Sequence, residues 1–525
     1  MYTSISKLIK QTLTLLGLVA VITAATGALK LESVKAAADP QISLTLSTTN
    51  KSVKPIKLSA KVTSSSDLKE VKYATGSHKA GYFTNEKYAS KVKTIALSAS
   101  NESTRTFKIK KNATYTFYAI DVNGNISTQK ITITNMEKED KAVWVSFLEF
   151  SSNGYDEVSF TEHINDMFDN IQADNFTTVY AVVRPFSDAM YPSKYFPFSK
   201  YCSGEQGKNP GYDPLQIMVD AAKARDLKIF AYINPYRVCS KADFKKIYKG
   251  SDDHEEGTVN PASPAYTWLN DGDSSTDRNV LYFSNYYYYN PAVPEVRELI
   301  INGVQEIVEN YDVDGIIFDD YFYPTLGAKY KKNFDYKEYN AYVKECKDAE
   351  EIPEFTNIAD WRRNNINLLV KGVYDTVKAC DDKLEFGISP AGNIENLKSD
   401  QKYYVDIDAW CNEDGYIDFI APQQYWGFDH SICPFEKNVK KWIDEVGNDN
   451  VKLYITLPMH DAEAKPTDEW RQNDDILARM IKSIRNKEDK IEGFSIFRYN
   501  FLTDPYLKSS GAKTERDKVL KEMKK

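Results

Sequence analysis

Apolar and polar positions along the chain change their pattern near residue 140. Between Gln41 and Asn135 they alternate over short runs such as IKLSAKV, TRTFKIK and TYTFYAI. Alternation with a period of two residues is typical of strands with one buried face. Roughly seven such runs with turn residues between them predict a small all-β sandwich.

After the charged linker MEKEDK, continuous apolar runs are separated by longer stretches with helical periodicity, such as PEVRELIINGVQEIVENY. The apolar runs are AVWVSFLEF, TTVYAVVRP, LKIFAYINP, VDGIIFDD, LEFGISP, YIDFIAPQQYW, VKLYITLP and IEGFSIFRYN. Apolar strands that alternate with helices predict a parallel sheet. Eight such units in about 370 residues predict a (β/α)8 TIM barrel over residues 142–525. An open doubly wound sheet is the alternative, but no glycine-rich phosphate loop follows the first run.

The all-β part carries one more specific signal. Its segment ATYTFYAIDVNGNIS resembles the late hairpin of bacterial immunoglobulin-like surface modules, with Asn123 and Gly124 in the tight turn. We therefore expect an immunoglobulin-like sandwich over residues 40–136, preceding the barrel. No residue pattern in it indicates chemistry, so spacing or weak surface binding is its expected role.

The N-terminus has the order of an export signal. Lys7 and Lys10 precede the apolar stretch TLTLLGLVAVITAATGA, and three alanines follow at residues 36–38. This order predicts a signal peptide over residues 1–38 and a secreted or cell-envelope associated protein. An uncleaved anchor helix is the alternative, because the stretch is close to the minimum of about 17 residues for a membrane span.

Charge and composition narrow the classes of partner. A formal net charge of -8 argues against nucleic acid, whose binding requires basic patches. The six cysteines form no C-x-x-C pair and there are only five histidines, so we expect no metal site and no cofactor. Aromatic residues make up 13% of the chain, which suits stacking on sugar rings.

In a barrel of this type the chemistry lies at the C-terminal ends of the strands. The fourth run ends in Asp319 and Asp320, followed by Tyr321. Successive strand residues face opposite ways, which places Asp319 towards the barrel mouth. Neighbouring carboxylates raise each other's pKa, a property suited to acid/base catalysis. The structural alternative is that both aspartates stabilise the turn before Tyr321.

Carboxylates among tyrosines and tryptophans indicate glycoside hydrolysis, which needs one acid and one nucleophile or base. Asp319 is the predicted main catalytic carboxylate, with Glu149 at the first strand end or Asp320 as its partner. Tyr425 and Trp426, after the sixth run, are predicted to stack on sugar rings. Few histidines are present, so a Ser-His-Asp arrangement is not expected.

At these residues the sequence resembles the glycosyl hydrolase-like 10 family. The matching blocks, in the family's order, are RPFSDAMYPSKYFPFS, GYDPL, NPYRV, NPAVPEVRELI, VDGIIFDDYFYP, WRRNNIN, FGISPAGN and APQQYW. The resemblance covers nearly all of the second part and does not extend to the sandwich. It implies a (β/α)8 barrel that cleaves peptidoglycan glycan strands already stripped of their stem peptides.

The matched blocks also supply the predicted substrate contacts. These are Arg184, Asp188, Tyr191, Asn234, Tyr236, Arg237, Tyr321, Tyr323, Gln424, Tyr425 and Trp426. The chain departs from the family at Ile317, where a histidine is usual. This departure keeps open a glycan-binding barrel without catalysis. An α-glucan-active, amylase-like enzyme is a third possibility, although the fifth run ends in Ser389 where that superfamily has a glutamate. The oligomeric state is left open.

Overall fold

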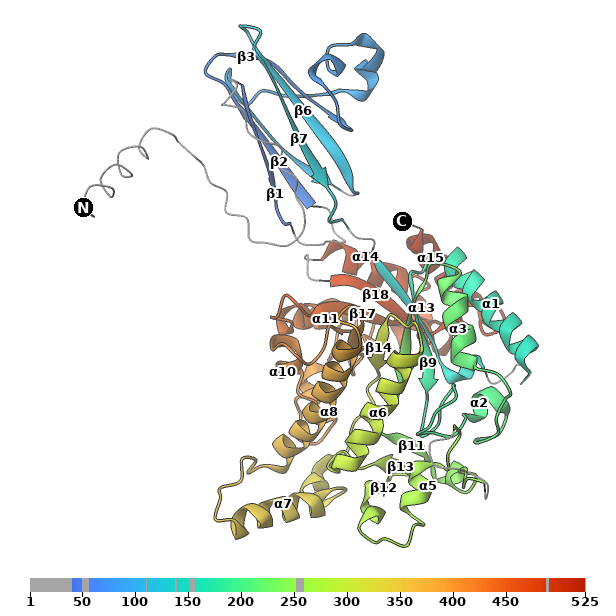
Figure 1. Cartoon of the computed structure of the whole chain (residues 1–525). Coiled ribbons are helices and arrows are strands. Elements are labelled where there is room, and N and C mark those ends of the chain that lie inside the picture. The colour runs from blue at the N-terminus through green and yellow to red at the C-terminus, as the bar shows by residue number, and fades with distance from the viewer. Residues whose placement is uncertain are drawn as a thin grey trace, which may run out of the picture. The chain divides into compact units, whose positions relative to one another are not determined.

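The computed structural model describes residues 40–49, 56–109, 111–136, 139–150, 156–251, 259–487 and 491–524. The predicted signal peptide lies outside these residues. The chain divides into two compact units, the first ending at Asn135 and the second beginning at Met136 (Figure 1). No helix within the described ranges is both long and apolar enough to cross a membrane.

The first unit consists of two antiparallel sheets. One contains β1 (Gln41–Leu46), β2 (Ile56–Thr63) and β5 (Glu102–Ile109), and the other β4 (Lys93–Ile95), β3 (Leu68–Thr75), β6 (Ala113–Asp121) and β7 (Ile126–Ile133). The ring of Phe107 on β5 lies 5.7 Å from that of Phe117 on β6, so the sheets pack face to face. The predicted small all-β domain is confirmed. Its likeness to immunoglobulin modules stays a prediction.

The second unit is a closed barrel of eight parallel strands, which confirms the predicted TIM barrel. Each of the eight apolar runs forms one strand. In order around the barrel they are β8 (Asp140–Val145), β9 (Thr178–Arg184), β10 (Lys228–Ile233), β14 (Gly315–Phe318), β15 (Glu385–Ile388), β16 (Phe419–Ile420), β17 (Lys452–Pro458) and β18 (Ile491–Phe497).

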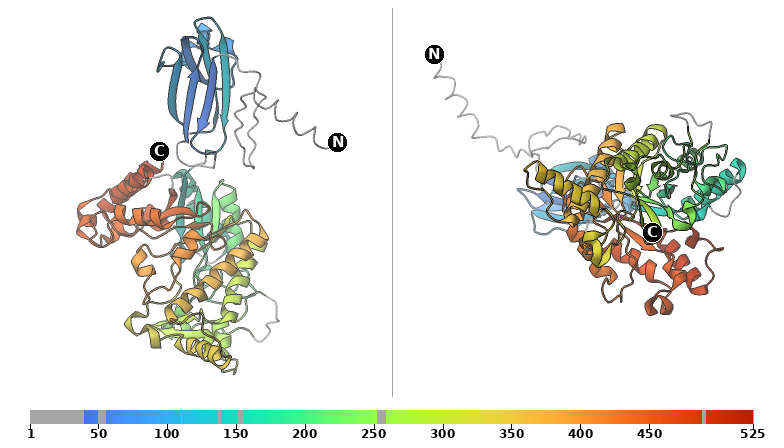
Figure 2. Two further views of the ribbon diagram at one scale, coloured as in Figure 1. Left: turned by 90° about the vertical axis from the view of Figure 1, so that its left-hand side faces the viewer. Right: turned by 90° about the horizontal axis from the view of Figure 1, so that it is seen from below.

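Helices surround these strands (Figures 1 and 2). The main helices that follow the successive strands are α1 (Glu157–Ala173), α3 (Pro214–Lys223), α6 (Pro294–Asn310), α8 (Ile358–Cys380), α10 (Ile407–Asn412), α11 (Phe435–Glu445), α14 (Ile476–Asn486) and α15 (Ser510–Met523). The loops also carry α2 (Lys200–Ser203), α4 (Lys241–Phe244), α5 (Pro264–Trp268), α7 (Tyr336–Asp348), α9 (Ile394–Leu397), α12 (Asp461–Ala464) and α13 (Asp468–Gln472).

Aromatic side chains fill the barrel interior. The ring of Phe419 lies 5.5 Å from Phe230 and 5.4 Å from Tyr454, and Tyr180 lies 5.6 Å from Phe230. Gly315 allows this packing, because a Cβ atom there would lie 2.0 Å from the Glu385 carbonyl oxygen and 2.7 Å from the Phe230 ring. The interior is therefore a packed core with no pore, and the chemistry is confined to the strand ends.

The loop after β10 contains a small antiparallel sheet of β11 (Arg237–Ser240), β13 (Tyr286–Tyr289) and β12 (Val280–Phe283). Because it follows the C-terminal end of a barrel strand, this sheet lies on the side of the barrel mouth (Figure 1). All six cysteines are free thiols.

Candidate active site

Asp319 lies directly after β14 and faces the inside of the barrel mouth. The phenol of Tyr232, on the neighbouring strand β10, donates a hydrogen bond of 2.6 Å to Asp319 Oδ2. Tyr232 itself packs inside the barrel, with its ring 5.0 Å from Trp144 of β8. Phe318, one residue earlier, faces outwards and contacts Phe386 at 5.1 Å. The alternation of β14 thus places Asp319 on the face expected from the sequence.

Burial and charge perturb this pair of aspartates. Asp319 is only 4% exposed, and its Oδ1 accepts a hydrogen bond of 3.1 Å from the Tyr321 amide. Burial and the nearby Asp320 charge raise the pKa of Asp319 to about 7, and burial also raises the pKa of Asp320. Tyr232 and Arg237 oppose the shift at Asp319 by stabilising its charged form. Near neutral pH the pair can therefore both hold and release a proton.

Arg237 is the cation of this group. Its guanidinium carbon lies 3.9 Å from the ring centre of Tyr321, 4.8 Å from Phe186 and 6.0 Å from Tyr286. Its Nε is buried without a hydrogen-bond partner, and no carboxylate among the described residues forms an ion pair with it. Asn234, also predicted, holds the backbone in place by accepting a 3.3 Å hydrogen bond from the Arg237 amide. The guanidinium is thus positioned by aromatic rings and retains unused donor capacity.

After β16 the structure brings Gln423, and not the predicted Gln424, to the aspartates. The Gln423 side chain stabilises the charge of Asp320 and donates a 3.1 Å hydrogen bond to the Ser389 carbonyl. Gln424 is buried behind it, accepting a 2.6 Å hydrogen bond from Asn438 Nδ2 and donating to the Gly392 carbonyl. The two side chains differ because adjacent residues on an extended segment face opposite ways, and substrate binding by Gln424 stays a prediction.

Glu149, a predicted catalytic residue, has its carboxylate oxygens bonded to protein groups. Oε2 accepts hydrogen bonds from Ser146 N at 2.8 Å and from Ser146 Oγ at 2.6 Å. Oε1 pairs with Arg498 at 2.5 Å and accepts from Asn500 N at 3.2 Å. Glu149 is 1% exposed, and its bonds hold the loops after β8 and β18 together. The geometry favours a structural role, and the catalytic role of Glu149 stays a prediction.

Several predicted substrate contacts lie behind the site and support its loops. Arg184 stacks over Phe196 at 4.6 Å, and Tyr191 donates a 3.4 Å hydrogen bond to the carbonyl of Gly303 on α6. Asp188 accepts from the Phe186 amide, and burial raises the pKa of Asp188 to about 6. Two further predicted substrate contacts, Tyr236 and Tyr323, are also buried.

Tyr425 is partly buried on the loop after β16, two strands from β14 around the barrel. Its ring lies 5.2 Å from His460 and 6.1 Å from Phe497. Burial, and then the charges of Asp320 and Asp461, raise the pKa of Tyr425 well above its usual value. Trp426 points to another neighbour, His430, at 5.9 Å.

Sequence reasoning missed three residues of the site: Tyr232 and Gln423, which interact with the aspartates, and His460, which packs against Tyr425. His460 follows the end of β17 by two residues, so the strand-end rule applied to histidines would have found it.

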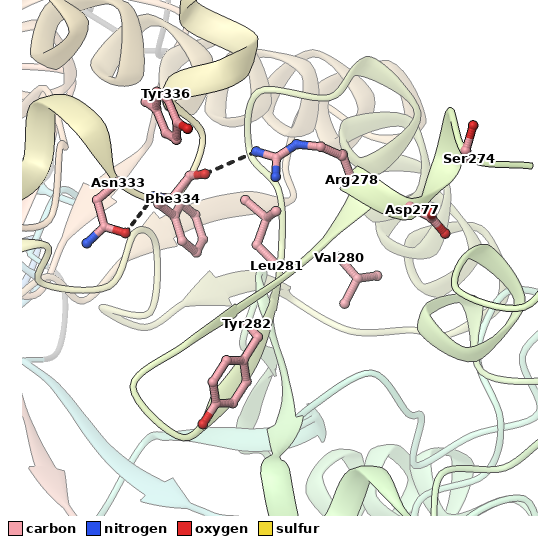
Figure 3. A pocket seen from close by; sticks show the side chains of 9 residues that line it. All are labelled: Ser274, Asp277, Arg278, Val280, Leu281, Tyr282, Asn333, Phe334 and Tyr336. Atoms are coloured by element: carbon pink, nitrogen blue, oxygen red, sulfur yellow. Dashed lines mark hydrogen bonds between the residues drawn. The ribbon is translucent and has the colours of Figure 1, made fainter.

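A cavity of about 610 Å³ lies between β12 and the 333–336 segment (Figure 3). Arg278 borders it and donates a 3.1 Å hydrogen bond to the Phe334 carbonyl while pairing with Glu338. None of the lining residues belongs to the group around Asp319. This cavity is therefore separate from the candidate active site around Asp319.

The raised pKa of Asp319 predicts a stabilising effect of Asp319→Asn at alkaline pH. Because the folded-state pKa is about 7, the contribution of this carboxyl to stability is greatest below about pH 4 and is lost as pH rises through 7. Asparagine carries no charge at any of these pH values. We therefore expect the free energy of unfolding of the variant to exceed that of the wild type by up to about 4 kcal/mol at pH 8 and by little at pH 4. Urea unfolding at both pH values measures the difference. An equal effect at both would contradict it.

Comparison with known proteins identifies the family of the barrel. Residues 136–498, well over half of the chain, match the family described as glycosyl hydrolase-like 10. The chain is 34% identical over 350 residues to glycosyl hydrolase YngK of Bacillus subtilis (strain 168), a match covering 63% of this chain and 62% of that protein. It is 33% identical over 360 residues to glycosyl hydrolase DigH of Escherichia coli (strain K12), covering 65% and 76% of the two chains.

Among solved structures, the PgaB (BpsB) glycoside hydrolase domain from Bordetella bronchiseptica superimposes with a TM-score of 0.47 at 14% sequence identity, covering 73% of this chain and 99% of that one. The sequence matches carry the assignment, and they support glycoside hydrolase chemistry in the matched barrel. The chain belongs to the glycosyl hydrolase-like 10 family.

Proposed function

We propose that the protein is an exported glycoside hydrolase that acts on cell-envelope polysaccharide, and specifically on peptidoglycan glycan strands stripped of their stem peptides. The observation that carries the proposal is the Asp319–Asp320 pair beside Arg237, a cation that forms no ion pair within 4 Å with a carboxylate of the described residues. The export-like N-terminus and the family membership support the cellular location and the reaction class.

The aspartate pair supplies the negative charge that glycoside hydrolysis requires. Its transition state resembles an oxocarbenium ion, which a carboxylate stabilises either by attack on the anomeric carbon or by activating water. The Tyr232 hydrogen bond fixes the Asp319 carboxylate in one orientation before the substrate arrives. Tyr321, 39% exposed and stacked on Arg237, offers a ring face to a sugar.

Arg237 supports the choice of stripped strands. Removal of the stem peptide from a muramic acid residue converts its lactyl amide into a free carboxylate. A guanidinium with free donors binds a carboxylate through charge-assisted hydrogen bonds, whereas an amide offers only a neutral acceptor. In this proposal Arg237 favours the stripped strand and also balances the charge of the aspartate pair.

The test of the reaction and substrate is reducing-end release from peptidoglycan strands with and without stem peptides. We expect release from stripped strands only. Release from neither form, with binding of stripped strands intact, would favour the glycan-binding barrel that the Ile317 departure leaves open. Oligosaccharides released from starch or glycogen would favour the amylase-like alternative.

Arg237→Met is expected to weaken selectively the use of stripped strands. Loss of a charge-assisted hydrogen bond of about 1.5–3 kcal/mol corresponds to a rise in KM of about 10- to 100-fold. The matched control is a strand whose lactyl carboxylates have been converted to primary amides. Wild type should distinguish the two strands and the variant should treat them alike. If the variant keeps the wild-type preference, Arg237 does not bind the carboxylate.

A further inference from the structure

A second acidic group follows another barrel strand and shares Tyr425 with the aspartate pair. His460 and Asp461 follow β17, and Asp461 is 7% exposed. The His460 ring packs 5.2 Å from Tyr425, 5.5 Å from Phe497 and 6.2 Å from Phe501. Tyr425 interacts electrostatically with Asp319, Asp320 and Asp461. The two acidic groups thus share one tyrosine between them.

The hydrogen-bond partners of His460 determine where its protons lie. Nδ1 is 3.4 Å from the carbonyl oxygen of Phe497, which can only accept, so Nδ1 carries a hydrogen. Nε2 is 3.3 Å from Oδ1 of Asp461. A bare imidazole nitrogen and a carboxylate oxygen would repel each other at this distance. A proton on His460 Nε2 or on Asp461 removes this repulsion.

The surroundings favour the neutral form of this pair, with the proton on Asp461. Burial raises the pKa of Asp461 to about 7 and lowers the pKa of His460. The positive charge of Arg498, on the loop after β18, further disfavours an imidazolium. Tyr425, on the loop after β16, is a titratable group that contacts the His460 ring. Below about pH 7 the pair is thus a carboxylic acid beside a neutral imidazole.

We propose that Asp461 is the general acid of the reaction and that His460 positions it and holds its proton. This inference rests on the proposed glycosidase function. Glycoside hydrolysis needs an acid separate from the carboxylate at the anomeric carbon. The oxygens of Glu149 are bonded to protein groups, and Asp320 adjoins Asp319 on the same strand end. Asp461 arises from a different strand end and retains a proton to give.

The proposed hydrolysis conserves protons and electron pairs. As the glycosidic C–O bond breaks, its electron pair moves to the leaving oxygen, which takes the proton of Asp461 and departs as an alcohol. A carboxylate of the Asp319–Asp320 pair either attacks the anomeric carbon directly or activates a water molecule that attacks it. If the pair attacks directly, water later adds its hydroxyl group to the anomeric carbon and its proton restores Asp461. If the pair activates water, the proton of that water goes to the pair, and exchange with solvent returns it to Asp461. The net change is hydrolysis of one glycosidic bond with one water molecule.

The first test compares leaving groups. Asp461→Asn is assayed on stripped glycan strands, whose alcohol leaving group needs a proton, and on a 4-nitrophenyl glycoside of their repeating disaccharide, whose leaving group does not. We expect a loss of about 100-fold or more on strands and less than about 10-fold on the nitrophenyl glycoside. The control is Asp468→Asn, because the Asp468 side chain is 80% exposed and should leave both rates unchanged.

The outcomes separate this inference from the substrate proposal. Wild-type rates on strands for Asp461→Asn, or equal losses on both substrates, would overturn the general-acid role while leaving the glycosidase proposal intact. Inactivity of the wild type on both substrates would overturn the two together.

A second readout does not depend on turnover. The chain has five histidines, so ring nitrogen resonances can be assigned by single substitutions. We expect His460 to be neutral at pH 7 with hydrogen on Nδ1, and its Nε2 resonance to move in Asp461→Asn. Hydrogen on Nε2 with a bare Nδ1 would overturn the proton assignment, whatever the activity.

Discussion

Asp319→Asn is expected to lower kcat on stripped glycan strands by about three orders of magnitude or more, equivalent to about 4 kcal/mol of transition-state stabilisation. The amide keeps the size of the carboxyl group and can still accept the Tyr232 hydrogen bond. It can neither bear the negative charge that stabilises an oxocarbenium-like centre nor form a covalent ester with it. Binding should change much less than turnover, so the loss should appear in kcat with KM nearly constant. Initial rates of reducing-end release measure both parameters.

The matched control is Asp314→Asn, because Asp314 lies at the opposite end of the same strand. Its Oδ2 accepts a hydrogen bond of 2.8 Å from the Ile229 amide, and Lys223 lies 3.6 Å away. Residues at the N-terminal face of such a barrel support stability and not catalysis. We expect Asp314→Asn to keep kcat within about twofold. Full activity of Asp319→Asn on every glycan that the wild type cleaves would show that Asp319 is not catalytic.

The fold was predictable because both faces of each barrel strand are buried. A strand covered by helices outside and by side chains inside gives a continuous apolar run, as in TVYAVVR of β9, where every residue is buried. Eight such runs separated by helical stretches allow few other arrangements. The two sheets of the first unit were predictable for a related reason. A strand with one buried face alternates apolar and polar residues strictly, as β2 does.

The position of Asp319 followed from the same alternation, but most of the predicted substrate contacts did not. Strand ends lose regular pairing, so side-chain direction can no longer be counted along the sequence. β16 is only two residues long. After it, the Gln423 side chain reaches Asp320, whereas the predicted Gln424 is buried. Arg184 and Glu149 look equally available in the sequence. Only the structure shows that Arg184 is buried over the Phe196 ring and that the Glu149 carboxylate pairs with Arg498.

The loop that follows Asp319 explains why matched blocks contain residues far from the chemistry. Tyr323 donates a 2.7 Å hydrogen bond to Asp335, whose carboxylate also pairs with Arg362 at 2.6 Å. Arg362 in turn donates a 2.9 Å hydrogen bond to the Asn333 carbonyl. These bonds fix the loop that begins with Tyr321, and Tyr321 is the ring on which Arg237 stacks. Tyr323 therefore acts on the site through the loop and has no direct contact with the aspartates.

Arg362→Met should be the most destabilising single change in this network, by about 3–5 kcal/mol, because it leaves Asp335 buried without its cation. Both side chains of the pair are fully buried. Asp335 can recover part of the loss by binding a proton, so the cost should be larger at pH 8 than at pH 5. The control is Arg363→Met, which removes the neighbouring arginine from partly exposed pairs with Asp360 and Asp400 and should cost about 1 kcal/mol or less. Urea unfolding of both variants at the two pH values measures this, and equal costs for Arg362 and Arg363 would show that the buried pair does not hold the loop.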